Sequence, residues 1–249
     1  MKPALLALSI IWFPSVLYCG GSSSFSLNLP TEITLLSTGA GVNLASIYFI
    51  RNAAPPSSTP DCFRGWPSFD YSKTQDRITT VLTAAGVISL PLLLDRLDRS
   101  QTATIGLMYL ESALLAWGTK DLIKGLFPKY RPYVSSGNTP AELLNEPDRY
   151  FSFPSGHTAM AFTTATFSSY IFSKSKVKPA LKVLFAACNF GLASTVATLR
   201  VTSGHHYFID VLGGAAIGTA SGLIVPLTHQ KKNISPVVNG KMVGFSIEL

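Results

Sequence analysis

Six apolar segments, each close to the length needed to cross a membrane, restrict the folds that this sequence can adopt. They cover residues 33–50, 78–94, 102–123, 155–172, 183–199 and 208–227. A membrane-spanning helix needs roughly 20 predominantly apolar residues. The sequence therefore predicts an all-α fold, a polytopic membrane bundle of about six helices.

The charge content supports this class of protein. Only 13% of the 249 residues are charged, which is about half of what a soluble domain usually carries. The net charge of +7 comes mostly from lysines and arginines in short connections, where positive residues normally flank membrane spans. We therefore expect membrane lipids, and no nucleic acid, as partners of this protein.

Four regions follow from the order of the segments. Residues 1–21 have a positive start, a short apolar stretch and then small residues, which predicts a signal peptide or an N-terminal anchor. Residues 22–76 contain the first apolar segment and a loop that several prolines keep irregular. Residues 77–228 form the predicted helical core, and residues 229–249 a polar tail.

Polar clusters interrupt the apolar pattern at three places. The first follows the third segment, where Lys124 lies in the last helical turn before a proline and Arg131 lies in the loop beyond it. The second is Phe-Pro-Ser-Gly-His at residues 153–157. There Ser155 and Gly156 offer backbone N–H groups at a helix N-terminus, which favours anion binding.

The third cluster, residues 200–210, joins the last two apolar segments. It contains Arg200, two adjacent histidines and Asp210. His206 and Asp210 are four residues apart and would share one face of a helix, so the carboxylate can orient the imidazole. His205 points about 100° away on such a helix, and we expect it to be a bystander.

Counting the crossings places all three clusters at one membrane face, because the third and fifth helices end there and the fourth and sixth begin there. Three cations, two histidine positions and a helix N-terminus suit phosphoryl transfer, which depends on positioning and on electrostatic stabilisation of the phosphoryl oxygens. One histidine can attack phosphorus, and the other can protonate the leaving oxygen.

These clusters resemble the three signature motifs of the type-2 phosphatidic acid phosphatase family, over roughly residues 78–227. The matching patterns are Lys124-x6-Arg131-Pro132, Pro154-Ser155-Gly156-His157 and Arg200-x5-His206-x3-Asp210. The family's third motif commonly begins Ser-Arg, whereas this chain has Leu199 before Arg200. That difference removes no group with a catalytic role.

The resemblance implies a role for each residue. His206 would be the nucleophile that forms a phosphohistidine, Asp210 would orient it, and His157 would be the general acid. The residues implied to bind the phosphate are Lys124, Arg131, Arg200, Ser155 and Gly156. A metal held by the histidines would leave the three cations unexplained and would be repelled by them, so we expect no metal and no other cofactor.

Other residues receive structural interpretations. Glu111 is expected to be hydrogen-bonded inside the bundle, although intramembrane acids can be functional. Lys120 and Lys129 are expected to contact lipid headgroups or solvent. Three small residues at four-residue spacing in the last segment are Gly214, Gly218 and Gly222. Such a stripe favours close packing between membrane helices.

The distribution of lysine and arginine sets the expected orientation. Four lysines within residues 174–182 lie on the side opposite the clusters. Further positive residues on that side are Arg96, Arg99, Lys231 and Lys232. By the positive-inside rule that side is cytoplasmic, so we expect a bacterial inner membrane protein whose clusters face the periplasm. A cleaved leader followed by six spans would give the opposite orientation, unless residues 33–50 do not fully cross.

The expected function is a metal-independent membrane phosphatase that hydrolyses a lipid phosphate monoester or pyrophosphate. Two alternatives are a lipid phosphotransferase that uses the same histidine, and a non-catalytic lipid-phosphate binder or transporter. A vanadate-dependent peroxidase would use a similar anion site, but the membrane setting argues against it. Residues 51–76 and 133–152 border the clusters and carry no motif that selects one lipid.

Overall fold

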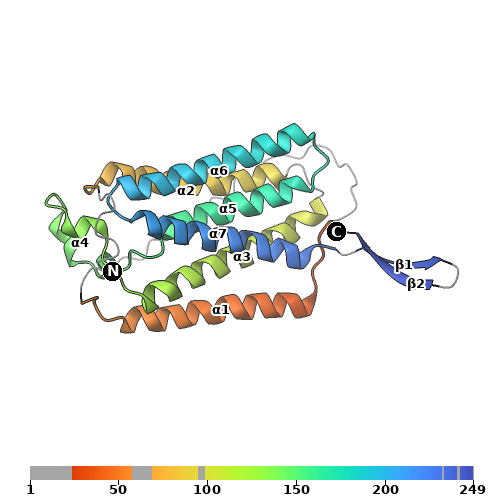
Figure 1. Cartoon of the computed structure of the whole chain (residues 1–249), viewed down its shortest axis with the longest axis horizontal. Coiled ribbons are helices and arrows are strands. Elements are labelled where there is room, and N and C mark those ends of the chain that lie inside the picture. The colour runs from red at the N-terminus through yellow and green to blue at the C-terminus, as the bar shows by residue number, and fades with distance from the viewer. Residues whose placement is uncertain (1–23, 58–68, 95–98, 232, 240–241, 249) are drawn as a thin grey trace.

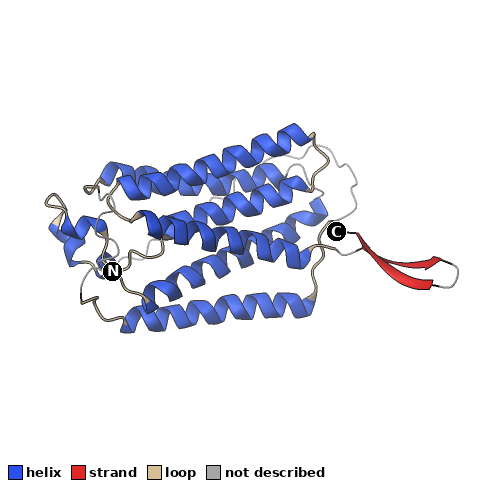
Figure 2. Cartoon of the chain, in the orientation of Figure 1, coloured by secondary structure: helices blue, strands red, loops and turns tan. Residues whose placement is uncertain are grey.

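The computed structural model describes residues 24–57, 69–94, 99–231, 233–239 and 242–248. Within these residues, long helices lie side by side in one bundle (Figures 1 and 2). They are α1 (Leu29–Asn52), α2 (Lys73–Leu94), α3 (Arg99–Leu126), α5 (Gly156–Ser173), α6 (Pro179–Thr202) and α7 (Phe208–His229). The predicted all-α bundle is confirmed. The expected signal peptide or anchor, residues 1–21, lies outside the described residues.

Two parts of the described chain lie outside the long helices. The loop between α3 and α5 contains three short helices, η2 (Pro132–Ser135), α4 (Ala141–Asn145) and η3 (Pro147–Tyr150). After α7, strands β1 (Asn233–Asn239) and β2 (Met242–Glu248) pair as an antiparallel hairpin. The sequence predicted only a polar tail there, because this stretch lacks the length and periodicity that identify the helices.

Three of the described helices, α1, α6 and α7, are long and apolar enough to cross a membrane. The chain is thus an integral membrane protein. Helix α5 is rich in threonine and serine because it lies inside the bundle, where it packs against α2, α3, α6 and α7. Most of its side chains are shielded from lipid by these neighbours, so its polarity is compatible with a membrane bundle.

The glycines of α7 bring its backbone onto α5. A Cβ atom at Gly214 would lie 2.5 Å from the carbonyl oxygen of Ser155, and one at Gly222 would lie 2.6 Å from that of Thr163. The predicted packing role of this stripe is confirmed, because no larger side chain fits at this separation. The close contact fixes the start of α7 against the start of α5.

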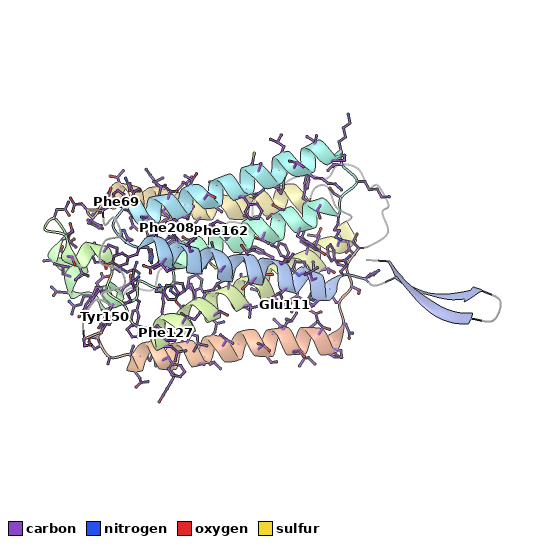
Figure 3. The ribbon with its side chains drawn as sticks, viewed as in Figure 1. Phe69, Glu111, Phe127, Tyr150, Phe162 and Phe208 are labelled. Atoms are coloured by element: carbon purple, nitrogen blue, oxygen red, sulfur yellow. The ribbon has the colours of Figure 1, made fainter. Side chains whose placement is uncertain are left out.

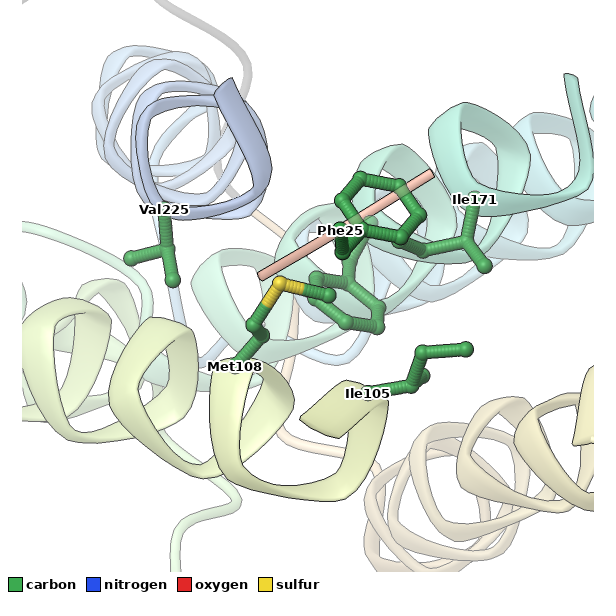
Figure 4. Packing of buried hydrophobic residues seen from close by; sticks show 6 residues of the cluster. Phe25, Ile105, Met108, Ile171 and Val225 are labelled. Atoms are coloured by element: carbon green, nitrogen blue, oxygen red, sulfur yellow. The ribbon is translucent and has the colours of Figure 1, made fainter. Parts of the chain in front are cut away.

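The half of the bundle that contains the ends of α5 and α7 has an apolar core, in which α3, α5 and α7 meet (Figure 4). It consists of Phe25, Ile105, Met108, Phe167, Ile171 and Val225, all nearly or fully buried. Helix α1 lies along the outer side of α3 (Figure 1). Its Asn43 donates a hydrogen bond to the Leu114 carbonyl of α3 at 2.9 Å, which ties the two helices together.

Candidate active site

All three polar clusters lie at one end of the bundle, where α3 ends and α5 and α7 begin (Figure 1). The short helices between α3 and α5 cover this end, and Figure 3 shows Tyr150 and Phe127 there. Contacts between the clusters link Arg131 to His206 and the Ser155 amide to the Asp210 carbonyl. The convergence expected from counting crossings is therefore found.

His206 lies just before α7, which begins at Phe208, and its side chain is almost fully buried. Its Nδ1 is 2.7 Å from the main-chain oxygen of Ser152, and its Nε2 is 3.1 Å from Nη1 of Arg131. A carbonyl oxygen can only accept and a guanidinium can only donate. The hydrogen of the neutral ring is therefore on Nδ1, and Nε2 presents a lone pair to the site.

Asp210 does not contact His206 as the helical spacing predicted. The closest approach, from Oδ2 to Nδ1 of His206, is 3.8 Å, beyond hydrogen-bond range. Because His206 precedes the helix, the i,i+4 geometry does not apply to it. Asp210 instead folds back to accept the Tyr207 amide at 2.8 Å and the Ser152 hydroxyl at 2.6 Å. It thus fixes Ser152, whose carbonyl holds the imidazole.

Lys129, which was expected to contact lipid headgroups or solvent, is buried inside the site. It is 5% exposed, and its Nζ donates to Oδ1 of fully buried Asp210 at 2.6 Å. The ammonium also lies 4.2 Å from the centre of the Tyr207 ring. Lys129 is thus the counter-ion of Asp210. The sequence held one indication of this pair: an aspartate expected to face the bundle interior, Asp210, needs a positively charged partner.

Arg131 is held from two sides. Its Nε donates to the Asp148 carbonyl at 2.8 Å and its Nη2 to the Asp148 carboxylate at 2.7 Å. This leaves Nη1 for His206 and for the His205 carbonyl at 3.3 Å. Burial acts to raise the pKa of Asp148, but Arg131 and Lys124 together hold that pKa below its usual value. Asp148 is therefore an ionised anchor for Arg131.

Helix α2 supplies contact partners for Arg200 of the third cluster and His157 of the second cluster. Arg200, 3% exposed at the end of α6, donates to the carboxylate of Asp76. Thr80, one turn further along α2, has its hydroxyl 3.5 Å from Nε2 of His157. Residues four apart share a helix face, so one face of α2 meets both the arginine and the expected general acid. No motif in the sequence indicated Asp76 or Asp148.

His205 is packed rather than exposed to the site. Its ring lies between Tyr71 and Tyr133, with both ring centroids 5.4 Å away. Its Nδ1 is 3.0 Å from the Ser203 hydroxyl and its Nε2 is 3.4 Å from the Asp76 carboxylate. Burial and then Arg200 lower the pKa of His205 to about 4. These contacts give it a role in supporting the loop between α6 and α7.

The remaining phosphate-binding candidates lie at the same end. Lys124 is 8% exposed, in the last turn of α3. The Ser155 amide was predicted to bind an anion. In the structure it donates to the Asp210 carbonyl at 2.9 Å instead, so this N–H is already used. Gly156 opens α5, and a Cβ there would lie 3.2 Å from the side chain of Lys120. Lys120 was expected to contact headgroups or solvent, but it is buried, and its Nζ lies 2.5 Å from the Asp121 carboxylate.

The cations determine the charge state of His206. Burial lowers its pKa well below the usual value, and Arg131, Arg200 and Lys124 lower it further. The imidazole is therefore neutral at neutral pH, with Nε2 unprotonated. A buried lone pair in contact with Arg131, and within the electrostatic influence of Arg200 and Lys124, suits attack on an anionic electrophile.

Comparisons with known proteins give one curated relative and two solved structures. The relative is a PA-phosphatase related-family protein of Dictyostelium discoideum, 37% identical over 112 residues. The match covers 42% of this chain, and the chain spans about two fifths (41%) of the relative's length.

The solved structures are more distant. LpxE of Aquifex aeolicus has 26% identity and a TM-score of 0.43, with 64% of this chain and 88% of that chain covered. A PAP2-type phosphatidylglycerolphosphate phosphatase of Bacillus subtilis has 20% identity and a TM-score of 0.44, with coverages of 79% and 91%. The family model described as PAP2 superfamily matches residues 105–234, more than half of this chain. The match spans the three polar clusters, and the chain belongs to the PAP2 superfamily.

Proposed function

We propose that this protein is a membrane phosphatase that hydrolyses a lipid phosphate monoester or pyrophosphate through a phosphohistidine on His206, without a catalytic metal. The observation that carries the proposal is the pair of contacts on the His206 ring. Nδ1 is fixed by the Ser152 carbonyl, and Nε2 has its lone pair beside Arg131. A histidine in this state is a nucleophile and not a general acid.

In the first step, the phosphate of the substrate displaces Arg131 from Nε2 and takes its hydrogen bonds. Arg131, Arg200 and Lys124 then neutralise charge on the phosphoryl oxygens. In the free site, burial and then Arg200 lower the pKa of His157 to about 3. The bound phosphate dianion offsets the cations, so we propose that His157 takes up a proton from solvent when the substrate binds. His206 Nε2 then attacks phosphorus, the bond from phosphorus to the ester oxygen breaks, and His157 gives that proton to the departing oxygen. The positive charge that His206 acquires is balanced by the nearby Asp210 carboxylate, 3.8 Å from Nδ1.

In the second step, His157 accepts a proton from water as the water oxygen attacks phosphorus. The bond from phosphorus to Nε2 breaks, and inorganic phosphate leaves. Each histidine returns to its starting state, so the cycle balances. If a lipid alcohol replaces water at this point, the same intermediate yields a phosphotransferase product.

Phosphate release from detergent-solubilised wild-type protein tests the proposal. A panel of phosphatidic acid, phosphatidylglycerol phosphate, undecaprenyl pyrophosphate and phosphorylated lipid A identifies the substrate. His206→Ala and His157→Ala are expected to abolish release, whereas Cys188→Ser, a change at an exposed residue on α6, should not. Undiminished turnover in His206→Ala would refute the nucleophile assignment. Binding of substrate without release by wild type would favour the non-catalytic binder.

We also propose that the catalytic end faces away from the cytoplasm, toward the periplasm of a bacterial inner membrane. The basis is the positive charge on the opposite side, including Lys174, Lys176 and Lys178 in the connection between α5 and α6. Reporter fusions at residues 145 and 176 test this orientation. Activity of a periplasm-only reporter at residue 176 would reverse it.

A further inference from the structure

Three ionisable side chains meet inside the bundle at the end opposite the catalytic residues. They are Glu32 in the first turn of α1, Glu111 on α3 and His229 at the end of α7. Their ligand-type atoms all lie within 4.8 Å of one another. His229 Nε2 is 2.9 Å from Oε1 of Glu32 and 3.5 Å from Oε2 of Glu111.

The hydrogen position on His229 makes this cluster unusual. Its Nδ1 is 2.8 Å from the Val225 carbonyl oxygen, which can only accept, so the hydrogen of a neutral ring is on Nδ1. Nε2 then carries a lone pair that faces two carboxylates. A second proton, on Nε2, would make the 2.9 Å contact with Glu32 a hydrogen bond but would leave the charge of one carboxylate unbalanced. A divalent cation between the three acceptors would balance both carboxylates.

The carboxylates have few other partners. Glu111 is 2% exposed, and neither of its oxygens has a hydrogen-bond partner among the described residues. Oε2 of Glu32 is likewise buried without a hydrogen-bond partner, while its Oε1 accepts the Asn28 amide at 3.3 Å and lies 2.9 Å from His229 Nε2. The predicted position of Glu111 inside the bundle is found, but its nearest polar contact among the described residues is His229 at 3.5 Å and not a hydrogen bond. Buried carboxylates without hydrogen bonds are costly.

The surroundings make that cost larger. Glu111 follows Met108 by three residues and His229 follows Val225 by four, so each shares a helix face with a member of the apolar core. Figure 4 shows Met108 and Val225 in that core, and Figure 3 shows Glu111 far from the residues labelled at the catalytic end. Two carboxylates in this setting carry a charge that a divalent cation would neutralise.

We propose that Glu32, Glu111 and His229 bind a divalent transition-metal ion, with Zn²⁺ the best match to one imidazole and two carboxylates. In a tetrahedral zinc site with bonds of about 2.0–2.1 Å, neighbouring ligand atoms lie about 3.4 Å apart. The observed 2.9 and 3.5 Å bracket this value. Metal-binding histidines usually donate their other ring N–H to a carbonyl or carboxylate, as His229 does to Val225.

The proposed site is structural and distinct from the catalytic one. Helix α7, which begins two residues after His206 and ends at His229, is about 33 Å long at 1.5 Å per residue. The ion would join α1 to α3 and α7 at the end where α1 begins. Glu32, with 11% side-chain exposure against 1% for Glu111, offers the route by which the ion enters.

Metal content and thermal stability of the full chain test the site. The protein is purified in detergent, freed of any affinity tag, treated with EDTA and desalted. Two equivalents of Zn²⁺ or Mn²⁺ are then added, and the bound metal is counted by mass spectrometry after a second desalting. The variants are Glu32→Gln, Glu111→Gln and His229→Gln. Glu142→Gln, at an exposed carboxylate of α4, is the matched control.

We expect wild type and the control to retain one Zn²⁺ per chain and the three variants less than a tenth of that. Zinc at 100 times its Kd should raise the Tm of wild type by roughly 5–10 °C and leave the variants unchanged. Phosphate release reports whether each variant is folded. If a variant does not fold, the metal content of wild type alone still shows whether the chain binds one ion.

Retention of no stoichiometric metal by wild type, or equal retention by the variants, would overturn the proposal. A Glu111→Gln variant more stable than metal-free wild type, combined with no metal in wild type, would also overturn it. That result would show that the carboxylates share protons instead.

Discussion

The Ser152 carbonyl oxygen lies 2.7 Å from Nδ1 of His206 and takes the hydrogen bond that the motif spacing assigned to Asp210. The aspartate acts one step removed, since its Oδ2 accepts the Ser152 hydroxyl at 2.6 Å. Backbone and side chain of Ser152 thus connect the carboxylate to the ring. This arrangement has consequences for variants that a direct His–Asp pair would not have.

The Ser152→Ala variant should lower kcat roughly tenfold, because it removes a hydrogen bond to a charged group worth about 1.5 kcal/mol. KM should change little, since Ser152 has no contact with the phosphate in this account. Steady-state kinetics measure both parameters. Ser136→Ala is the control, because it removes a hydroxyl that also bonds a carboxylate, that of Asp70. Unchanged kcat in Ser152→Ala would show that the link to Asp210 has no catalytic effect.

Lys129→Met should destabilise the protein by about 3–5 kcal/mol, because it leaves the buried Asp210 charge without its counter-ion. Denaturation in detergent measures the free energy of unfolding. Lys174→Met, at an exposed lysine beyond α5, should have little effect. The double variant Lys129→Met/Asp210→Leu should recover much of the lost stability. An equal loss in the double variant would mean that the pair itself, and not the unpaired charge, determines the effect.

The helices and the common location of the three motifs were predictable because both depend on local patterns. Apolar segment length identified α2, α3 and α6, and the order of crossings placed their ends. The buried ion pairs were not predictable, because Lys129 is 81 positions from Asp210, and Asp76 is 124 from Arg200. Such pairs have no local signature. The i,i+4 argument for His206 was wrong because it applied helix spacing to a residue that lies before Phe208, where both the predicted segment and α7 begin.

Asp148→Asn should lower kcat/KM about tenfold, the value expected for one lost charge-assisted hydrogen bond. Its carboxylate holds Nη2 of Arg131, and without it Nη1 is less well aligned on the phosphate. The main-chain bond from Arg131 Nε remains in the variant, so activity should persist. Glu146→Gln, at a neighbouring exposed acid, is the control for loop charge. A rise in kcat/KM would instead identify Asp148 as a competitor of the phosphate.

The pH profile of kcat/KM should reflect the lowered pKa of His206. A histidine of ordinary pKa becomes protonated, and cannot attack, as the pH falls below about 6.5. Because burial and the cations lower the pKa of His206, the neutral ring persists to lower pH. The acid limb due to this residue should therefore lie well below pH 6.5.

Lys124→Met removes one of the charges that lower this pKa. The acid limb of the kcat/KM profile of the variant should therefore lie at higher pH than that of wild type. Both profiles are measured with the same substrate between pH 4 and 8. Ionisation of the substrate is common to both enzymes, so the difference isolates the protein. A limb that stays in place or moves to lower pH would contradict the assigned charge state.

The central claim is that His206 becomes phosphorylated, and rapid-quench trapping with ³²P-labelled substrate tests it most directly. Wild type should give protein-bound label that is stable in alkali and labile in acid, as expected for a phosphohistidine, and peptide mapping should locate it at His206. The His206→Ala variant should give none. Label on another residue, or the same label in His206→Ala, would contradict the account.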